Sequence, residues 1–259
     1  MSELLLKSCD ARGVVTLTLN DPARFNALGA QMLQSLQDAL DAVARDDSVR
    51  VVVLAAEGKA FCAGHNLKDM AAHPELAYYQ QLFAQCSHMM LSIAKLPVPV
   101  IARVHGMATA AGCQLVAQCD LAVASTEASF ATSGINYGLF CATPSVPLVR
   151  NVPFKQAMEM LLTGDFMDAH TAQAQGLVNR VAAPAMLDAQ VEQLVQSIVQ
   201  KPATAVRMGK ALLYRQREMG LEAAYALAGE TMACNMLDPD AQEGAQAFAS
   251  KRQPQWRKP

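Results

Sequence analysis

The sequence predicts an α/β protein in which a sheet-forming part is followed by a helical C-terminal part. Continuous apolar runs at 51–54 and 97–104 are separated by a segment with helical periodicity. Unalternating runs of this kind are typical of parallel strands that are covered on both faces. From about Pro153 onward the pattern becomes almost wholly helical. We therefore interpret the chain as an α/β core followed by a helical region.

The N-terminal part is predicted to begin with a β-hairpin and to carry two amphipathic helices. The hairpin strands are 4–8 and 14–20, because apolar and polar residues alternate in the second of them. Asn26 is expected to cap the first helix, whose apolar positions recur as far as Val43. The second helix lies within 74–96, and its apolar stripe is Leu82, Cys86, Met89 and Ile93.

The later elements follow from the same periodicities. A short helix comes after the apolar run 97–104 and its turn, and strands are expected at 121–124 and 129–131. The C-terminal helices predicted from their apolar faces are 154–164, 169–176, 184–200, 203–217, 221–235 and 239–249.

Composition and charge exclude several classes of protein. The net charge of −2 gives no electrostatic reason to expect nucleic acid, and no apolar run is long enough to cross a bilayer. His73, His88 and His170 are too dispersed to suggest a metal site, and His105, which follows a strand, is interpreted as a core histidine. The seven cysteines lack a C-x-x-C pair and are interpreted as buried free thiols in a reducing compartment. With no secretory or transit segment at the start, we expect a cytoplasmic protein. The basic tail 251–258 is interpreted as a solvated end rather than an anion site.

Two short turns are the main indication of a functional site in this sequence. The turns 61–67 and 106–115 each follow a strongly β-like run and consist mainly of small residues. Such turns let backbone N–H groups approach a ligand closely, and two of them could aim two donors at one oxygen, as in an oxyanion hole. The glycine patterns of a nicotinamide site and of a P-loop are both absent.

These turns resemble those of the crotonase superfamily, the enoyl-CoA hydratase/isomerase family. Members carry F-x-A-G-x-D-L and V-x-G-x-A-x-G-G-G-x-E-L after two strands. By this match His65 supplies the first oxyanion N–H and Ala111 the second, and Asn66 replaces the usual aspartate. The similarity covers nearly the whole chain and also includes the segments 24–28, 161–164, 172–178 and 248–254.

The resemblance implies a ββα spiral core over 1–200, with the acyl-CoA site, and a helical region over 201–259 that forms a homotrimer or a dimer of trimers, a hexamer. It implies that coenzyme A is part of the substrate, that no separate cofactor or metal is needed, and that the thioester carbonyl sits in the oxyanion hole. The reaction would be that of a lyase in fatty acid metabolism. The residues expected to bind acyl-CoA are Arg24, Phe25, Ala63, Gly64, Asn66, Leu67, Met107, Ala108, Tyr137 and Leu139.

The chain departs from the family at its two acid–base positions. Hydratases of the family use two glutamates, and the matching residues here are Gln114 and Gly134. Loss of one acid–base group typically costs ~10²- to 10⁴-fold in rate, so ordinary hydration is expected to be weak. The same departure, and the stretch 136–144, resemble the subgroup called enoyl-CoA hydratase domain-containing protein 3 and its bacterial relatives.

Other groups are candidates to replace the glutamates. The His65 ring could exchange protons. The simpler interpretation is that the ring points away from the ligand and that only the backbone N–H of His65 acts, as a hydrogen-bond donor. Cys141 is expected where a helix begins beside the pocket, so its thiol pKa could be lowered, although a packed thiol is favoured. Three hypotheses remain open: an enzyme of enolate chemistry, a non-catalytic acyl-CoA-binding protein, and a hydrolase that uses Cys141 or Cys62 with His65.

Overall fold

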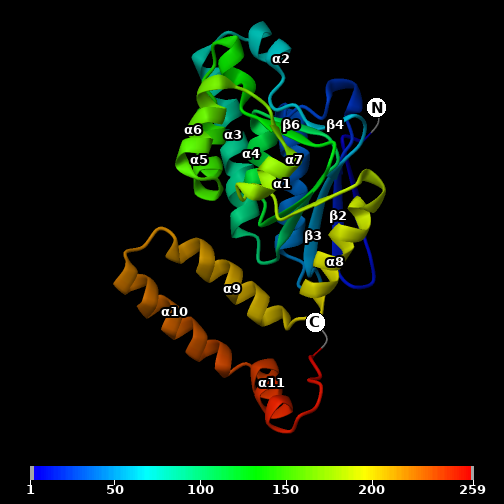
Figure 1. Ribbon diagram of the computed structural model, residues 1–259, viewed down its shortest axis with the longest axis vertical. Coiled ribbons are helices and arrows are strands. Elements are labelled where there is room, and N and C mark those ends of the chain that lie inside the picture. Colours follow the sequence, from blue (N-terminus) through cyan, green and yellow to red (C-terminus); the bar gives the residue numbers. More distant parts are fainter. Residues whose placement is uncertain (1–2, 258–259) are drawn as a thin grey trace.

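The computed structural model describes residues 3–257 and has an α/β core from which a helical arm extends (Figure 1). Within those residues the strands form two sheets, of six strands in the order β1-β2-β3-β5-β7-β10 and of four in the order β4-β6-β8-β9. The strands are β1 (Leu5–Cys9), β2 (Val14–Leu19), β3 (Val51–Ala56), β4 (Ala60–Cys62), β5 (Val100–Val104), β6 (Met107–Thr109), β7 (Leu121–Ser125), β8 (Ser129–Ala131), β9 (Met167–Asp168) and β10 (Arg180–Ala182).

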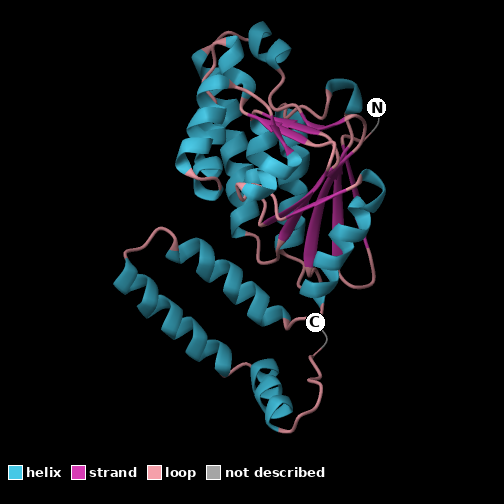
Figure 2. Ribbon diagram, in the orientation of Figure 1, coloured by secondary structure: helices cyan, strands magenta, loops and turns pink. Residues whose placement is uncertain are grey.

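The chain alternates between the two sheets, which gives the ββα spiral that the resemblance implies. Strands β3, β5 and β7 pair in parallel in the larger sheet, and each continues directly into β4, β6 or β8 of the smaller one. Figure 2 shows the two sheets at an angle to one another, with helices around them. The carboxyl ends of β4, β6 and β8 therefore meet, and the two predicted turns come together.

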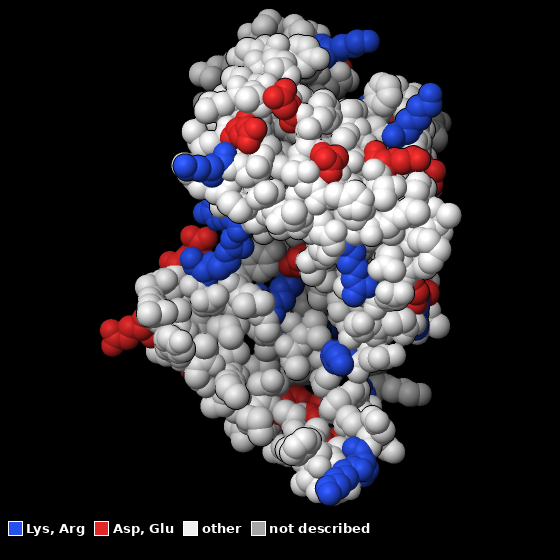
Figure 3. All heavy atoms as spheres, in the orientation of Figure 1, with Lys and Arg blue, Asp and Glu red and all other residues white. Residues whose placement is uncertain are grey.

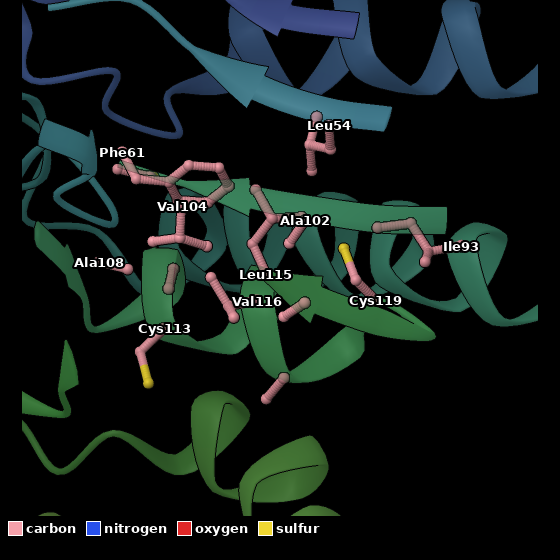
Figure 4. Close-up of a cluster of buried hydrophobic side chains, with 14 of the residues drawn as sticks. Leu54, Phe61, Ile93, Ala102, Val104, Ala108, Cys113, Leu115, Val116 and Cys119 are labelled. Carbon is pink, nitrogen blue, oxygen red and sulfur yellow. The ribbon is translucent and has the colours of Figure 1, made fainter. Parts of the chain in front are cut away.

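Helices cover both faces of the larger sheet. The inner face packs on α1 (Ala30–Ala44), α3 (Leu76–Lys95) and α4 (Ala111–Gln118), and Figure 4 shows side chains of β5 and α4 meeting in this core. The outer face packs on α8 (Leu187–Val199) through a separate apolar cluster. This confirms the prediction of parallel strands covered on both faces. The remaining helices are α2 (Leu67–Ala72), η1 (Pro22–Arg24), η2 (Ser133–Tyr137), α5 (Ala142–Asn151), α6 (Phe154–Thr163), α7 (Ala169–Ala174) and η3 (Pro184–Met186).

Asn26 does not cap the first helix, so that prediction is wrong. Helix α1 begins at Ala30 after Gly29, and Asn26 is fully buried with a left-handed φ of 54°. Its side chain accepts a hydrogen bond from the Asp21 N–H at 2.9 Å and donates to the carbonyls of Glu57 and Ala60 at 2.8 and 2.9 Å. Asn26 therefore fastens the loop before α1 to the β3–β4 connection instead of starting the helix.

The arm consists of α9 (Ala203–Gln216), α10 (Leu221–Met236) and α11 (Pro239–Ala249), and α9 and α10 lie side by side (Figure 1). Lys210 of α9 is buried and donates to the Ile93 and Val98 carbonyls, both at 2.9 Å, and to Asp120 at 2.6 Å. The same carboxylate accepts from the Tyr214 hydroxyl at 3.0 Å. Removal from water lowers the pKa of Lys210, and Asp120 opposes that shift. The arm is thus joined to the core by a buried ion pair.

The basic tail is tied to the acidic side of α11, as far as the described residues reach. Arg252 pairs with Glu243 at 2.5 Å, and Arg257 lies 3.1 Å from Asp238. These arginines are already neutralised within the chain, in keeping with a solvated end; Lys258 lies outside the described residues. The face in Figure 3 carries scattered charges of both signs and no continuous basic surface.

Five of the seven cysteines are buried free thiols, as predicted, whereas Cys9 and Cys234 are exposed. Among residues 3–257 no helix is long and apolar enough to cross a membrane. No group of three or more histidine, cysteine, aspartate or glutamate residues suited to a metal ion is found in that same range.

Candidate functional site

The candidate site is a cavity of about 870 Å³ bordered by both predicted turns. It opens between the loop at Arg24, the turn after β4, the start of α4, η2 and the start of α5. The sequence-predicted residues that line it are Arg24, Phe25, Ala63, His65, Asn66, Leu67, Met107, Ala111, Gly134, Tyr137, Leu139 and Cys141. Gly64, Ala108 and Gln114 are buried but are not among its lining residues.

Two glycines allow the turns to pack against each other. A Cβ on Gly64, whose φ is +84°, would lie 2.9 Å from the Ala111 nitrogen and 2.9 Å from the Ala110 Cβ. A Cβ on Gly112 would overlap the carbonyl of Cys62, with 2.7 Å to its carbon atom. Each turn therefore places a glycine where the backbone of the other passes, which only a residue without a side chain permits.

The N–H groups of His65 and Ala111 have no acceptor within residues 3–257. Ala111 is the first residue of α4, where N–H groups have no partner inside the helix. Both residues line the cavity, so both donors are available to a ligand there.

The strained residue of this turn is Ala110 rather than Ala111. Ala110 precedes α4 with φ 51° and ψ −120°, a conformation that glycine adopts far more easily than alanine. Ala111 lies inside the helix, so its conformation does not require glycine. An alanine at the second oxyanion position is thus compatible with the backbone found here.

Replacing Ala110 with glycine is expected to stabilise the protein. The substitution removes the strain of a positive φ from the folded state, which stabilises it, and adds conformational freedom to the unfolded chain, which stabilises that state less. The net result is an increase of about 1 kcal/mol in the free energy of unfolding. Denaturant unfolding of the two proteins measures the difference. A lower stability for Ala110→Gly would show that the Ala110 methyl group contributes more by packing than its backbone loses by strain.

The loop at Arg24 is joined to the first turn by backbone hydrogen bonds. The Ala63 N–H donates to the Phe25 carbonyl at 3.0 Å, and the Leu28 N–H donates to the Gly64 carbonyl at 2.8 Å. Phe25 is half exposed at the cavity, and the Arg24 side chain is largely exposed. This edge, with Lys68, supplies the cationic groups of the cavity, as recognition of phosphates requires.

The two positions where the resemblance leads one to expect glutamates have no acid or base here. Gln114 is 4% exposed on α4, and its Oε1 has no hydrogen-bond partner within the described chain. A Cβ on Gly134 would lie 2.6 Å from the Leu139 carbonyl oxygen and 2.8 Å from the Cys141 Sγ. The loop after η2 therefore occupies the space that a side chain at residue 134 would need.

The His65 ring is held as a neutral group. Its Nδ1 lies 2.8 Å from the Leu28 carbonyl oxygen, and because a carbonyl only accepts, Nδ1 carries the proton. Burial lowers the pKa of the ring, against a smaller opposing effect of the hydrogen bond. Its Nε2 is buried without a partner in residues 3–257. This favours the interpretation in which the ring is structural and only the backbone N–H faces a ligand.

Neither cysteine of the hydrolase hypothesis is activated. Cys141 is the N-cap of α5, as predicted, and burial raises the pKa of its thiol, which supports the favoured interpretation of a packed thiol over a thiol with a lowered pKa. The helix terminus does not offset the loss of water around the sulfur. Burial raises the pKa of Cys62 to about 12, and this residue does not line the cavity.

Sequence reasoning missed a pair of hydroxyl groups in the wall. Thr109 Oγ1 and Ser133 Oγ lie 2.7 Å apart, and both residues line the cavity. Thr109 belongs to a turn that the sequence identifies, but a sequence does not indicate which side of the turn its hydroxyl faces. Ser133 gives no signal beyond its place after a predicted strand.

A second cavity, of about 880 Å³, lies between α8 and the outer face of the larger sheet. Both of its arginines are paired with acidic residues: Arg103 lies 2.5 Å from Asp188, and Arg12 lies 2.6 Å from Asp10. No residue of the turns 61–67 and 106–115 lines it. The cavity at the turns is therefore the better candidate for a catalytic site, because it combines free donors with an apolar wall.

Comparison with known proteins agrees with this geometry. The family model described as enoyl-CoA hydratase/isomerase matches residues 10–259. A crystal structure of enoyl-CoA hydratase from Mycobacterium smegmatis is 62% identical, with a TM-score of 0.98 over 98% of this chain and 99% of that chain. The crystal structure of human enoyl-CoA hydratase domain-containing protein 3 is 41% identical, with a TM-score of 0.94 over 98% of this chain and 100% of that chain.

A Xenopus laevis relative, named enoyl-CoA hydratase domain-containing protein 3, mitochondrial, is 45% identical over 94% of this chain and 83% of its own length. The resemblance to that subgroup is confirmed. Because the family model matches nearly the whole length of this chain, the chain belongs to the enoyl-CoA hydratase/isomerase family and has the crotonase fold.

Proposed function

We propose that this protein binds an acyl-CoA thioester and stabilises the enolate of that thioester with the N–H groups of His65 and Ala111. The observation that carries the proposal is the pair of free donors beside the Gly64–Ala111 contact. When a thioester carbonyl becomes an enolate, negative charge develops on its oxygen. Each donor aimed at that oxygen is typically worth about 3–4 kcal/mol in the transition state.

The rest of the cavity suits such a ligand. The loop with Arg24 and Phe25, together with Ala63, Asn66 and Leu67, would hold the coenzyme A part, and Met107, Tyr137 and Leu139 would surround the acyl part. Gly64 and Ala108, also predicted to bind acyl-CoA, are buried and do not line the cavity. Coenzyme A then arrives as a portion of the substrate, and the proposal includes no separate cofactor.

Ordinary hydration is expected to be weak. Gln114 cannot exchange a proton near neutral pH, and Gly134 has no side chain. The thiol of Cys141 has a raised pKa and the His65 ring a lowered one. We therefore propose a hydratase-like lyase in fatty acid metabolism with little hydration, or an enzyme of another enolate reaction, such as decarboxylation, isomerisation or thioester cleavage.

A non-catalytic acyl-CoA-binding protein is the second candidate. The observation that favours it is the filled space at Gly134. A cavity that keeps two donors but has no room for a second carboxylate binds a carbonyl without a means to move protons.

Binding and turnover of a short panel of enoyl- and acyl-CoA thioesters test the proposal on purified protein. Binding with slow or no hydration of crotonyl-CoA is the expected result. Hydration at an ordinary enzymatic rate would contradict the proposed loss of acid–base groups. A folded protein that binds none of the thioesters would overturn the acyl-CoA site itself.

We also propose that the chain forms a homotrimer or a dimer of trimers through its arm. Large apolar side chains are exposed along α10, including Leu221, Tyr225 and Met232, and such faces are typical of contacts between subunits. A cytoplasmic location remains our prediction, although the Xenopus laevis relative is named mitochondrial. Analytical ultracentrifugation and fractionation of the source cells test these two points.

A further inference from the structure

The hydroxyl pair of Thr109 and Ser133 stands at the carboxyl ends of two neighbouring parallel strands. Thr109 ends β6, and Ser133 follows β8, with Thr109 opposite Ala131 in the register. The Ala110 N–H donates to the Ala131 carbonyl at 2.9 Å and fixes the two ends together. The pair therefore occupies a defined position in the wall, with Thr109 in the turn 106–115 and Ser133 directly before Gly134.

The pair has hydrogen-bonding capacity left over. Two hydroxyl groups carry two donor hydrogens, and their mutual bond at 2.7 Å uses one of them. No other hydrogen bond of either side chain is formed within residues 3–257. Thr109 is only 7% exposed, and both residues line the cavity. An O–H donor left without a partner at such a position is unfavourable, so the pair is a site for a ligand group that supplies one.

The position of the pair limits which atom of a ligand can reach it. Thr109 and Ala111 are two residues apart, so their Cα atoms are separated by at most about 7 Å. A group that contacts the hydroxyls while the thioester carbonyl meets the Ala111 N–H must therefore lie on one of the first carbons of the acyl chain. The charged lining residues Arg24, Lys68 and Asp69 belong to other segments of the wall, so the pair itself offers a partner only neutral hydroxyl groups.

We propose that Thr109 and Ser133 are specificity-determining residues that hydrogen-bond a hydroxyl group on the acyl chain of the thioester. A ligand hydroxyl both accepts the free O–H and donates to a lone pair, so it satisfies both capacities of the pair. A saturated acyl chain satisfies neither. This inference rests on the proposed function, because it needs the thioester carbonyl in the oxyanion hole.

Calorimetric titration with butyryl-CoA and 3-hydroxybutyryl-CoA tests the inference. The unaltered protein is expected to bind the hydroxylated thioester roughly 3- to 10-fold more tightly, the size of one or two net neutral hydrogen bonds. In Thr109→Val and in Ser133→Ala this ratio is expected to fall towards one while the affinity for butyryl-CoA stays within about twofold. Thr143→Val is the matched control, because Thr143 also lines the cavity but lies outside the pair; it should keep the ratio.

Two results would overturn the inference while the proposed function stands. One is equal binding of both thioesters by the unaltered protein. The other is an unchanged ratio in both variants, with or without a lower melting temperature, which would make the pair a purely structural link between β6 and β8. If the folded protein binds neither thioester, the proposed function fails, and the inference fails with it.

Discussion

We expect Gly112→Ala to abolish acyl-CoA binding and to lower the free energy of unfolding by about 3 kcal/mol or more, near the upper end for overpacked sites. Alanine is the better helix former, so its effect within α4 comes only from the contact with Cys62. The added Cβ overlaps the Cys62 carbonyl, and that atom is backbone at the end of a buried strand. The two turns would have to separate, which moves the His65 and Ala111 donors apart.

Gly229→Ala is the matched control. Gly229 lies in α10, where an added Cβ meets nothing within 4 Å, so this variant should bind as before and gain about 0.5–1 kcal/mol of stability. Thermal unfolding and titration with an acyl-CoA thioester measure both effects. Normal binding by a folded Gly112→Ala variant would refute the idea that the donors depend on close packing of the turns.

The double substitution Gln114→Glu with Gly134→Glu is expected not to create a hydratase. A side chain at residue 134 meets the Leu139 carbonyl oxygen at 2.6 Å and the Cys141 sulfur at 2.8 Å. Inserting this side chain should lower the free energy of unfolding by about 1–3 kcal/mol and displace the loop after η2. The new carboxylate would then not be held in position beside a ligand. A glutamate at residue 114 would be buried, which raises the pKa of a carboxyl group.

Crotonyl-CoA hydration and thermal unfolding check this prediction, with Gln114→Glu alone as the control for the first position. The single variant should remain folded and lack the second group. A gain of more than about 10²-fold in hydration by the double variant, the effect of one acid–base group, would mean that the loop yields and that only the two carboxylates are missing.

The sheet core and both turns are predictable from the sequence because each has a local signal. The run 51–54 is apolar at every position, and it forms most of β3, which is buried along its whole length. The turns are recognisable because small residues follow such strands, and both lie at the cavity. The sequence pattern of each strand does not indicate which strands are neighbours. Only the folded structure shows that β4 pairs with β6, so that the ends of these two strands lie together.

The errors arise where a side chain has alternatives that only the fold resolves. Asn26 has the residue type of a helix cap, yet buried carbonyls of a distant segment compete for its amide. For Cys141 the sequence left two alternatives open, and the fold supports the favoured packed thiol, because the loss of solvent outweighs the field of the helix. The crowding at Gly134 depends on a loop five residues later, and a sequence does not indicate such a backbone approach.

The buried Lys210–Asp120 pair has a mechanical consequence. Asp120 also accepts a hydrogen bond from the Val100 N–H at 2.7 Å, so one carboxylate joins the first residue of β5 to the middle of α9. The first helix of the arm consequently moves as one body with the sheet. The turn between Gln216 and Leu221 is held as well, because Arg217 donates to the Arg150 carbonyl and Glu218 pairs with Arg150 of α5 at 3.6 Å. The core therefore holds the arm along α9 and at the turn that leads to α10.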